Sequence, residues 1–268
     1  MQKDKIKKFK KDKSYGQNFL IDQNVLQKIV AAGEITSTDF ILEIGAGQGV
    51  LTTELAKRAG RVLSLEVDSR LIPELQEKFV QEKNVEIKNT DVLSFETKSL
   101  ANQSYKIVAN IPYNLTSLIL TKFLSGEVKP NLMVLLVQKE VAQRICAAPG
   151  ESSFLTIMVQ YFGQPEILQI VKPSSFNPPP QVDSAILKIV SIQQRQNSEQ
   201  EKFFFQLVKI GFSQKRKMLK KNLKALFSET AIKQALEQTK LLAQCRAEDL
   251  SLDDWLKLAE NLSKIKLK

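Results

Sequence analysis

The sequence predicts an α/β protein in which a parallel, doubly wound sheet is followed by a small all-α domain. Apolar, strand-like segments alternate with helix-like segments from Phe40 to about residue 190, and this alternation is typical of βαβ units. Beyond residue 200 only helical periodicity remains. A polar stretch of low complexity over residues 191–200 separates the two parts, and we interpret it as a linker.

The expected elements of the first part follow one another regularly. A helix is expected over residues 23–32, where apolar residues recur on one side at helical spacing, namely Val25, Leu26, Ile29 and Val30. Short apolar runs predict strands over residues 40–44, 61–66, 85–89, 105–109, 132–138, 166–171 and 185–190. Helices are expected over residues 50–59, 69–81, 115–125 and 139–147. We divide the chain into a domain of residues 1–190, with a flexible basic arm over 1–13, and a helical domain of residues 191–268.

The composition indicates a nucleic-acid partner. The chain has 268 residues, of which 43% are hydrophobic and 25% are charged, as in ordinary globular proteins. Its net charge of +10 favours a polyanion, and nucleic acid more than a membrane surface. The longest apolar run, residues 132–137, is too short to cross a bilayer, and no apolar signal segment follows the lysine-rich start. We expect a cytoplasmic protein without a membrane partner.

The rare residue types exclude several kinds of chemistry. The chain contains no histidine, which excludes imidazole bases, histidine-based triads and histidine-ligated metals. Its two cysteines, Cys146 and Cys245, are far apart and form no CxxC pair, so neither a disulfide framework nor a zinc site is expected. Catalysis must then depend on carboxylates, amides, aromatic rings, lysines or a cofactor, and we expect no metal.

The segment Asn110-Ile-Pro-Tyr113 follows the expected strand 105–109, at the edge of the sheet where α/β proteins bind ligands. It suits methylation of the exocyclic amine of a nucleobase, whose lone pair is delocalised into the ring. The Asn110 amide oxygen and a carbonyl near Pro112 can accept the two N–H bonds and draw the lone pair back onto nitrogen. Pro112 fixes the backbone, and Tyr113 offers a flat face on which an extruded base can stack. The alternative from this segment alone is a polar turn.

A glycine-rich loop, Glu43-Ile-Gly45-Ala-Gly47-Gln-Gly49, follows the first strand of the expected sheet. Glycines there let the backbone turn sharply and approach a ligand closely. Glu66 ends the next strand, where a carboxylate can accept hydrogen bonds from both hydroxyls of a ribose. Asp91 follows the third strand and is placed to accept from an adenine amino group. Either acid, taken singly, is equally well explained as a solvated side chain.

Two ligands compete for this loop. A dinucleotide fingerprint has the spacing GxGxxG, with a helix N-terminus facing a pyrophosphate. Here the spacing is GxGxG and an acid precedes it, which suits a ligand that has a cationic end and no phosphate. S-adenosylmethionine is such a ligand, and the sequence favours it over a nicotinamide dinucleotide.

On these motifs and several more, the sequence resembles the ribosomal RNA adenine dimethyltransferases, and among them the small-subunit (16S) branch. The resemblance runs nearly from end to end. It rests on Tyr15–Leu20, Glu43–Gly49, Leu65–Asp68, Asp91, Asn110–Asn114, Phe176–Ser184, Phe212–Leu223 and Arg246–Ser251. It implies a Rossmann-like, S-adenosylmethionine-dependent methyltransferase domain with a small C-terminal all-α domain, and S-adenosylhomocysteine as the product.

The resemblance also implies roles for single residues. The implied cofactor-binding residues are Asn18, Leu20, Gly45, Gly47, Glu66, Asp91 and Asn110. Asn110 would also touch the target amine, beside Pro112. Tyr113 and Phe176 would hold the extruded adenine between their rings. The stiff run Pro178-Pro-Pro180 is expected to keep the Phe176 ring on a loop, outside the core.

The segment 212–226 is amphipathic and predicts a helix with one apolar and one basic side. Its apolar residues are Phe212, Leu219, Leu223 and Leu226. A lysine stripe is usually a solvated helix face, but the net charge of +10 and an RNA target favour contact with phosphates. The expected RNA-binding residues are Lys215, Arg216, Lys217, Lys220, Lys221 and Lys224.

The expected activity is dimethylation of two adjacent adenosines in the 3′-terminal hairpin of 16S rRNA. A monomer would act on a precursor of the small ribosomal subunit. Three alternatives stay open: a large-subunit (23S) rRNA adenine methyltransferase of the antibiotic-resistance type, a non-catalytic RNA-binding assembly factor with the same fold, and a nicotinamide oxidoreductase. The segments 212–223 and 246–251 favour the small-subunit branch, and the intact Asn110–Tyr113 favours a catalyst.

Overall fold

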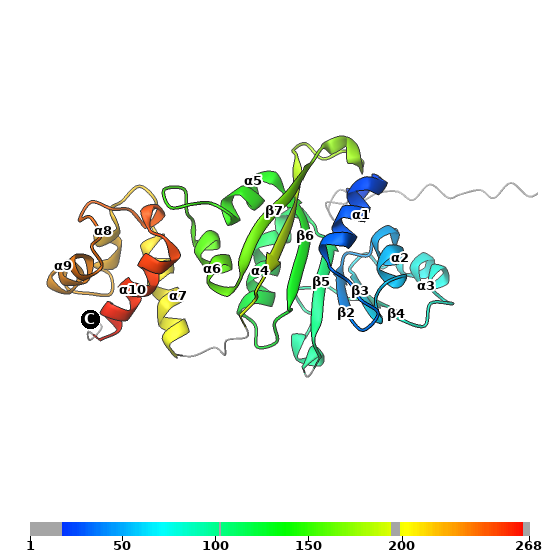
Figure 1. Cartoon of the computed structure of the whole chain (residues 1–268), viewed down its shortest axis with the longest axis horizontal. Coiled ribbons are helices and arrows are strands. Elements are labelled where there is room, and N and C mark those ends of the chain that lie inside the picture. Colours follow the sequence, from blue (N-terminus) through cyan, green and yellow to red (C-terminus); the bar gives the residue numbers. More distant parts are fainter. Residues whose placement is uncertain (1–17, 102, 194–198, 265–268) are drawn as a thin grey trace, which may run out of the picture.

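A seven-stranded sheet forms the centre of the molecule, with the strand order β4-β3-β2-β5-β6-β9-β7 (Figure 1). The computed structural model describes residues 18–101, 103–193 and 199–264. The expected basic arm over residues 1–13 lies outside the described residues, as do residues 194–198 of the expected linker.

The first five strands are parallel, as the alternating pattern predicts. They are β2 (Phe40–Ile44), β3 (Arg61–Glu66), β4 (Val85–Asn89), β5 (Tyr105–Asn110) and β6 (Leu132–Gln138). Four of the five expected ranges are confirmed at both ends, and β5 is one residue longer than expected. The chain reverses its direction across the sheet after β4, so that β5 pairs with the other edge of β2. The carboxyl ends of β2 and β5 therefore flank a topological switch point, where open α/β sheets bind their ligands.

The last two strands of this sheet depart from the parallel arrangement, although the predicted fold class is confirmed. β9 (Ser184–Val190) lies between β6 and β7 (Gln164–Val171) and runs antiparallel to both. A parallel neighbour needs a crossover connection, which is usually a helix. The connection over residues 172–183 contains four prolines and only a single 3₁₀ turn, Pro173–Ser175, so the chain returns beside β7 without crossing over.

Six helices of the first part cover the two faces of this sheet (Figure 1). They are α1 (Gln23–Ala32), α2 (Val50–Ala56), α3 (Ile72–Lys78), α4 (Thr116–Ser125), α5 (Lys139–Ile145) and α6 (Phe154–Phe162). Residues of α1 and α2 pack on one face of the sheet, and residues of α4, α5 and α6 pack on the other. The helices expected over 50–59 and 69–81 are shorter in the structure, because turns replace their outer ends.

Residues 199–264 form a helical part that packs on α6, at the opposite end of the molecule from α2 and α3 (Figure 1). Its helices are α7 (Glu199–Gly211), α8 (Leu219–Leu223), α9 (Glu229–Gln238) and α10 (Leu252–Ser263). Aromatic rings join the two parts: Phe205 stacks on Phe162 at 5.5 Å between centroids, and Phe204 stacks on Tyr161 at 4.7 Å. The division at residues 190 and 191 falls at the end of β9, and it remains a prediction as a domain boundary.

The expectation of one continuous helix over residues 212–226 is wrong. α7 ends at Gly211 and α8 spans only Leu219–Leu223, so residues 212–218 form a turn. The buried Asn222 side chain holds this turn, because its Nδ2 donates to the Gly211 carbonyl at 2.5 Å and to the Gln214 carbonyl at 3.3 Å. The four expected apolar residues still belong to the helical core, as the pattern predicts.

Gly211 allows close contact between α7 and α10, and its substitution tests the packing of the helical part. A methyl group on Gly211 would lie 2.3 Å from the Trp255 ring, which is fully buried. Alanine normally stabilises a helix by about 0.5–1 kcal/mol relative to glycine, but overpacking a core costs about 1–3 kcal/mol. We expect Gly211→Ala to lower the free energy of unfolding in a urea titration, whereas Lys209→Ala, exposed on the same helix, changes it little. A stabilised Gly211→Ala protein would contradict this packing.

Candidate active site

A pocket opens at the carboxyl ends of β2, β3 and β5, beside the topological switch point. The residues that line it come from the N-terminal segment, the glycine-rich loop and three strand ends. Among them are Asn18, Leu20, Gly45, Gly47, Glu66, Asp91, Asn110, Pro112 and Tyr113. The structure thus brings nine of the ten residues expected at the cofactor and the target base into one cavity, and it leaves out Phe176.

The glycine-rich loop wraps around the end of β3. The Gly45 N–H donates to the Leu65 carbonyl at 2.8 Å, which holds the start of the loop against that strand. Gly47 has φ +56°, a conformation that L side chains rarely adopt. A Cβ there would also lie 3.2 Å from the ring of Phe19. Glycine at position 47 therefore lets the loop backbone face the pocket directly.

Glu66 is 5% exposed and ties the loop to the end of β3. Its Oε2 accepts from the Gly47 N–H at 2.8 Å, and its Oε1 accepts from the Asp68 N–H at 2.9 Å. Burial raises the pKa of Glu66, although these two N–H donors act in the opposite direction. Each carboxylate oxygen has a second acceptor site, so the side chain can still take two hydroxyl groups of a ligand.

Asp91 lies at the far end of the pocket, just beyond β4. Its Oδ1 accepts from the Leu93 N–H at 2.9 Å, which fixes the carboxylate at the start of a turn. Val67 also lines this end of the pocket and is 47% exposed, unusually open for an apolar side chain. The sequence analysis did not single out Val67, although it follows Glu66 directly. An exposed apolar side chain and a carboxylate in one pocket offer contact to a flat ring and an acceptor to an amino group.

The N-terminal segment closes the other side of the pocket. Asn110 at the end of β5 donates through Nδ2 to the Asn18 carbonyl at 3.3 Å. Leu20 stands in β1 (Phe19–Leu20), which pairs with β8 (Phe176–Asn177). A residue 92 positions earlier in the chain is thereby placed against Asn110, which no local pattern could predict.

Pro112 and Tyr113 continue from Asn110 along the pocket wall. Pro112 has φ −59° and ψ 131°, and its carbonyl accepts from the Leu115 N–H at 3.0 Å, which leaves one further acceptor site on that oxygen. The Tyr113 hydroxyl lies 2.6 Å from the Ser184 hydroxyl at the start of β9. Burial raises the pKa of Tyr113, so the ring stays neutral at physiological pH. Ser184, which the sequence analysis gave no role, anchors this ring.

Phe176 does not stand outside the core, and the expectation drawn from the proline run is wrong. The ring is 3% exposed and belongs to the apolar cluster that includes Leu20, Val171 and Ile186. The reason is the pairing of β8 with β1, which places Phe176 opposite Leu20 and turns its side chain inward. The proline run begins only after this pairing.

The charge of the pocket identifies the kind of ligand that fits. Among its described lining residues are the two acids Glu66 and Asp91 and no lysine or arginine. A phosphate-bearing ligand would be repelled, whereas a ligand with a cationic centre, a ribose and an adenine would meet suitable groups. The charge of the pocket thus favours the same kind of ligand as the GxGxG spacing does.

No group of three or more histidine, cysteine, aspartate or glutamate side chains within the described residues could hold a metal ion. Within the same residues, no helix is both long and apolar enough to cross a membrane.

The expected RNA-binding residues lie on the helical part. Lys215, Arg216 and Lys217 are exposed in the turn between α7 and α8. Lys221 and Lys224 are exposed at and just after α8, and Lys220 is half-buried. Lys224 forms an ion pair of 3.0 Å with Glu229. The basic residues therefore form an exposed turn followed by a short helix, instead of one long helix face.

The fold and the pocket define a Rossmann-like, S-adenosylmethionine-dependent methyltransferase. Residues 8–264 match the family described as ribosomal RNA adenine dimethylase. The chain belongs to this family. The nicotinamide oxidoreductase alternative is therefore not favoured, and the resemblance in the sequence is confirmed.

Two curated relatives show how close the match is. A ribosomal RNA small subunit methyltransferase A of Dehalococcoides mccartyi is 42% identical over 254 residues, covering 92% of this chain and 86% of the relative. A protein of the same name from Lactiplantibacillus plantarum is 40% identical over 264 residues, covering 93% and 89%.

Two solved structures are similar over the whole fold. A dimethyladenosine transferase from Plasmodium falciparum has a TM-score of 0.76 and 30% identity, covering 92% of this chain and 98% of that chain. The 23S rRNA methyltransferase ErmE has the same TM-score at 28% identity, covering 92% and 100%. The fold alone therefore does not separate a small-subunit from a large-subunit enzyme.

Proposed function

We propose that this enzyme dimethylates the exocyclic amine of two adjacent adenosines in the 3′-terminal hairpin of 16S rRNA, with S-adenosylmethionine as the methyl donor. The observation that carries the proposal is the position of Asn110–Tyr113 at the carboxyl end of β5, on the wall of an acidic pocket. The cofactor pocket and an amide with an aromatic ring suited to a nucleobase amine thus share one wall.

Different residues of the pocket would bind different parts of the donor. Bound there, S-adenosylmethionine supplies an electrophilic methyl group on a cationic sulfur. We assign the backbone around Gly45 and Gly47 to its methionine part, Glu66 to the ribose hydroxyls and Asp91 to the adenine amino group. Asn18 and Leu20 would close the pocket over it. The resemblance suggests these assignments, and the positions of the same residues on the pocket wall support them.

Asn110 and the backbone at Pro112 would orient the target amine. The Asn110 amide oxygen and a carbonyl near Pro112 accept its two N–H bonds, which restores the lone pair on nitrogen. Tyr113, fixed by Ser184, would stack on the extruded base. The attack leaves a cationic nitrogen that loses its proton readily, so a chain without histidine needs no dedicated base. The rate would come from positioning and the exclusion of water.

The small subunit is the preferred target because of the relatives. The two curated relatives named above for the small subunit are 42% and 40% identical to this chain, whereas ErmE is 28% identical. We propose a precursor of the small subunit as the substrate of a cytoplasmic monomer. The test is to incubate the protein with labelled S-adenosylmethionine and either small or large ribosomal particles, and then to map the label. Label on the large particle, or on neither, would contradict the proposal.

The Glu66 assignment predicts a loss of cofactor affinity. Glu66→Ala removes a charged acceptor for two ribose hydroxyls, and such bonds contribute about 1.5–3 kcal/mol. We expect calorimetry to show weaker binding of both S-adenosylmethionine and S-adenosylhomocysteine, because both contain the ribose. Unchanged affinity for both would refute the assignment. Glu86→Ala, an exposed change on β4, serves as the control.

The Tyr113 assignment predicts a slower methyl transfer with intact cofactor binding. Stacking on a base contributes about 1–3 kcal/mol, so Tyr113→Ala should reduce the rate on small ribosomal particles while cofactor affinity is kept. Tyr113→Phe keeps the ring and loses only the contact with Ser184, so it should retain most of the rate. A Tyr113→Ala protein that loses cofactor affinity equally would assign the ring to the cofactor pocket.

Phe176 in the base sandwich remains a prediction, and its burial sharpens the test. A buried Phe→Ala change costs about 3–5 kcal/mol of stability, so we expect Phe176→Ala to lower the urea midpoint clearly. If the ring also leaves the core to meet the base, the folded Phe176→Ala protein transfers methyl groups more slowly at unchanged cofactor affinity. An unchanged rate in the folded protein would leave the ring with its core role alone.

The basic residues of the helical part predict a salt-dependent contact with RNA. Each phosphate contact contributes about 0.7–0.9 to the slope of log affinity against log salt. Changing Lys217, Lys220, Lys221 and Lys224 to Gln should weaken particle binding and flatten this slope, while the fold persists. The control removes the same charge from the first domain, at Lys28, Lys83, Lys88 and Lys98. If the variant of the helical part bound the particle with the wild-type slope, as the control is expected to do, Lys217, Lys220, Lys221 and Lys224 would be solvated residues without an RNA contact.

A further inference from the structure

Glu43 at the end of β2 is a buried acid that the proposed mechanism does not use. It is 0% exposed. Its Oε2 accepts from the Thr52 hydroxyl at 2.6 Å and from the Ser64 hydroxyl in a short hydrogen bond. Its Oε1 has no hydrogen-bond partner within the described residues. An unsatisfied buried carboxyl oxygen is costly, so the position calls for an explanation beyond packing.

Glu43 lies directly behind the loop that faces the donor pocket. The two residues that follow it, Ile44 and Gly45, both line the pocket. Its side chain contacts Thr52 of α2, on the opposite side of β2 from the Ile44 side chain. The Glu43 side chain and the pocket therefore lie on the two sides of the β2 end, and the backbone of Ile44 and Gly45, which we assign to the methionine end of the donor, joins them.

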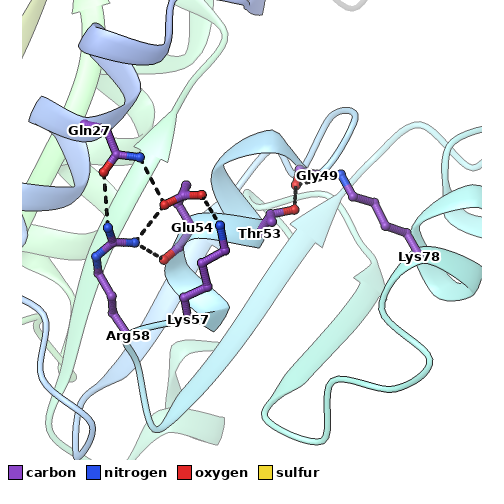
Figure 2. Close-up of polar contacts among 7 residues, drawn as sticks. All are labelled: Gln27, Gly49, Thr53, Glu54, Lys57, Arg58 and Lys78. Carbon is purple, nitrogen blue, oxygen red and sulfur yellow. Dashed lines mark hydrogen bonds and ion pairs between the residues drawn. The ribbon is translucent and has the colours of Figure 1, made fainter.

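The charged groups that face Glu43 leave its charge without a direct counter-ion. Glu66 of β3 has the same sign and disfavours ionisation. Lys78 of α3 acts from a distance, because its Nζ donates to the Gln48 carbonyl at 3.0 Å and to the Gly49 carbonyl at 3.1 Å. Figure 2 shows Lys78 beside Gly49. Glu43 forms no ion pair with any described residue, and α1 contributes apolar side chains to this face.

The charged side chains of α2 and of the turn that follows it interact with one another and not with Glu43. Glu54 bonds with Lys57 at 2.6 Å and with Arg58 at 2.8 Å, and Gln27 of α1 bonds with both Glu54 and Arg58 (Figure 2). In Figure 2 this group and Lys78 lie on opposite sides of α2. The Glu54 carboxylate is thus paired with two cations, unlike Glu43, and it supplies a matched control for Glu43.

Burial and the neighbouring groups together bring the pKa of Glu43 close to neutral pH. Burial raises the pKa of Glu43 to about 7, although the hydrogen bonds from Ser64 and Thr52 and the distant Lys78 act in the opposite direction. Near neutral pH the ligand-free protein therefore holds both the protonated and the ionised form. A positive charge on the other side of the loop would favour the ionised form.

We propose that Glu43 is a positioning and specificity-determining residue that distinguishes the cationic methyl donor from its neutral product by ionising when the donor binds. The inference rests on the proposed use of the pocket for S-adenosylmethionine. Donor and product share the ribose and the adenine, so Glu66 and Asp91 treat them alike. They differ in the positive charge on sulfur, and Glu43 responds to that charge. When the donor binds, the Glu43 carboxyl group releases a proton to solvent. When the methyl group has been transferred and the sulfur is neutral, the Glu43 carboxylate takes up a proton again.

The pH dependence follows with a definite sign. A bound cation lowers the pKa of Glu43, so donor affinity falls as pH drops and the carboxylate protonates. If donor binding lowers this pKa by about one unit, donor affinity rises about fivefold between pH 6 and pH 8. Product affinity changes far less over the same range, so discrimination in favour of the donor increases with pH.

The test is calorimetry of both ligands with the unmodified protein. Binding of S-adenosylmethionine and of S-adenosylhomocysteine is measured between about pH 6 and pH 8, in pairs of buffers with different heats of ionisation. We expect proton release of up to about half a proton per donor near pH 7, and little release with the product. Equal proton release with both ligands would overturn the proposal. Failure of both ligands to bind would instead overturn the proposed function.

Two variants assign the proton to Glu43. Glu43→Gln keeps the size of the side chain and an acceptor for Thr52 and Ser64, so product affinity should persist while the pH-dependent donor preference is lost. Glu54→Gln, the same change on α2, should behave like the unmodified protein. The amino group of the ligand titrates equally in all three proteins and cancels in the comparison. Undiminished proton release in Glu43→Gln would overturn the assignment, as would an equal loss of donor and product affinity.

Discussion

The parallel pairing of β2 with β3 and β5 is the constraint on which the site depends. Leu42 pairs with Ile107 and Ile44 with Leu65, so backbone hydrogen bonds on both sides hold the end of β2. The glycine-rich loop, Glu66 and Asn110 follow from the ends of these three strands, at one edge of the sheet. Because the functional side chains stand on strand ends, only the loop has to bend, and glycines with positive φ allow that bend.

Charge is distributed unevenly in this protein, and each region suits a different partner. The whole chain carries +10, yet the described lining of the pocket contains acids and no lysine or arginine, with Glu43 behind the loop. The exposed cations of the turn between α7 and α8 lie on the helical part instead. Under the proposed function, a cationic donor and a polyanionic substrate would be drawn to separate places on one molecule.

The aromatic contacts between α6 and α7 fix the position of the basic turn relative to the pocket. Tyr161 and Phe162 of α6 stack on Phe204 and Phe205 of α7, with rings 4.7 and 5.5 Å apart. Close-packed rings resist sliding and rotation. The position of the basic turn relative to Tyr113 is therefore set by packing, so that RNA held by the turn would meet the pocket in a defined orientation.

The sequence by itself determined the strands, because each is a short apolar run bounded by polar or glycine residues, and β2, β3, β4 and β6 begin and end as expected. It also determined the pocket residues of the loop and strand ends, since parallel strands carry their carboxyl ends to one edge. Only the tertiary structure decided the positions of side chains that contact residues far away in the sequence. The β1–β8 pair buries Phe176, Asn222 fastens the basic turn, and Thr52 with Ser64 surrounds Glu43. These contacts join residues 8 to 158 positions apart, and periodicity along the chain carries no information about them.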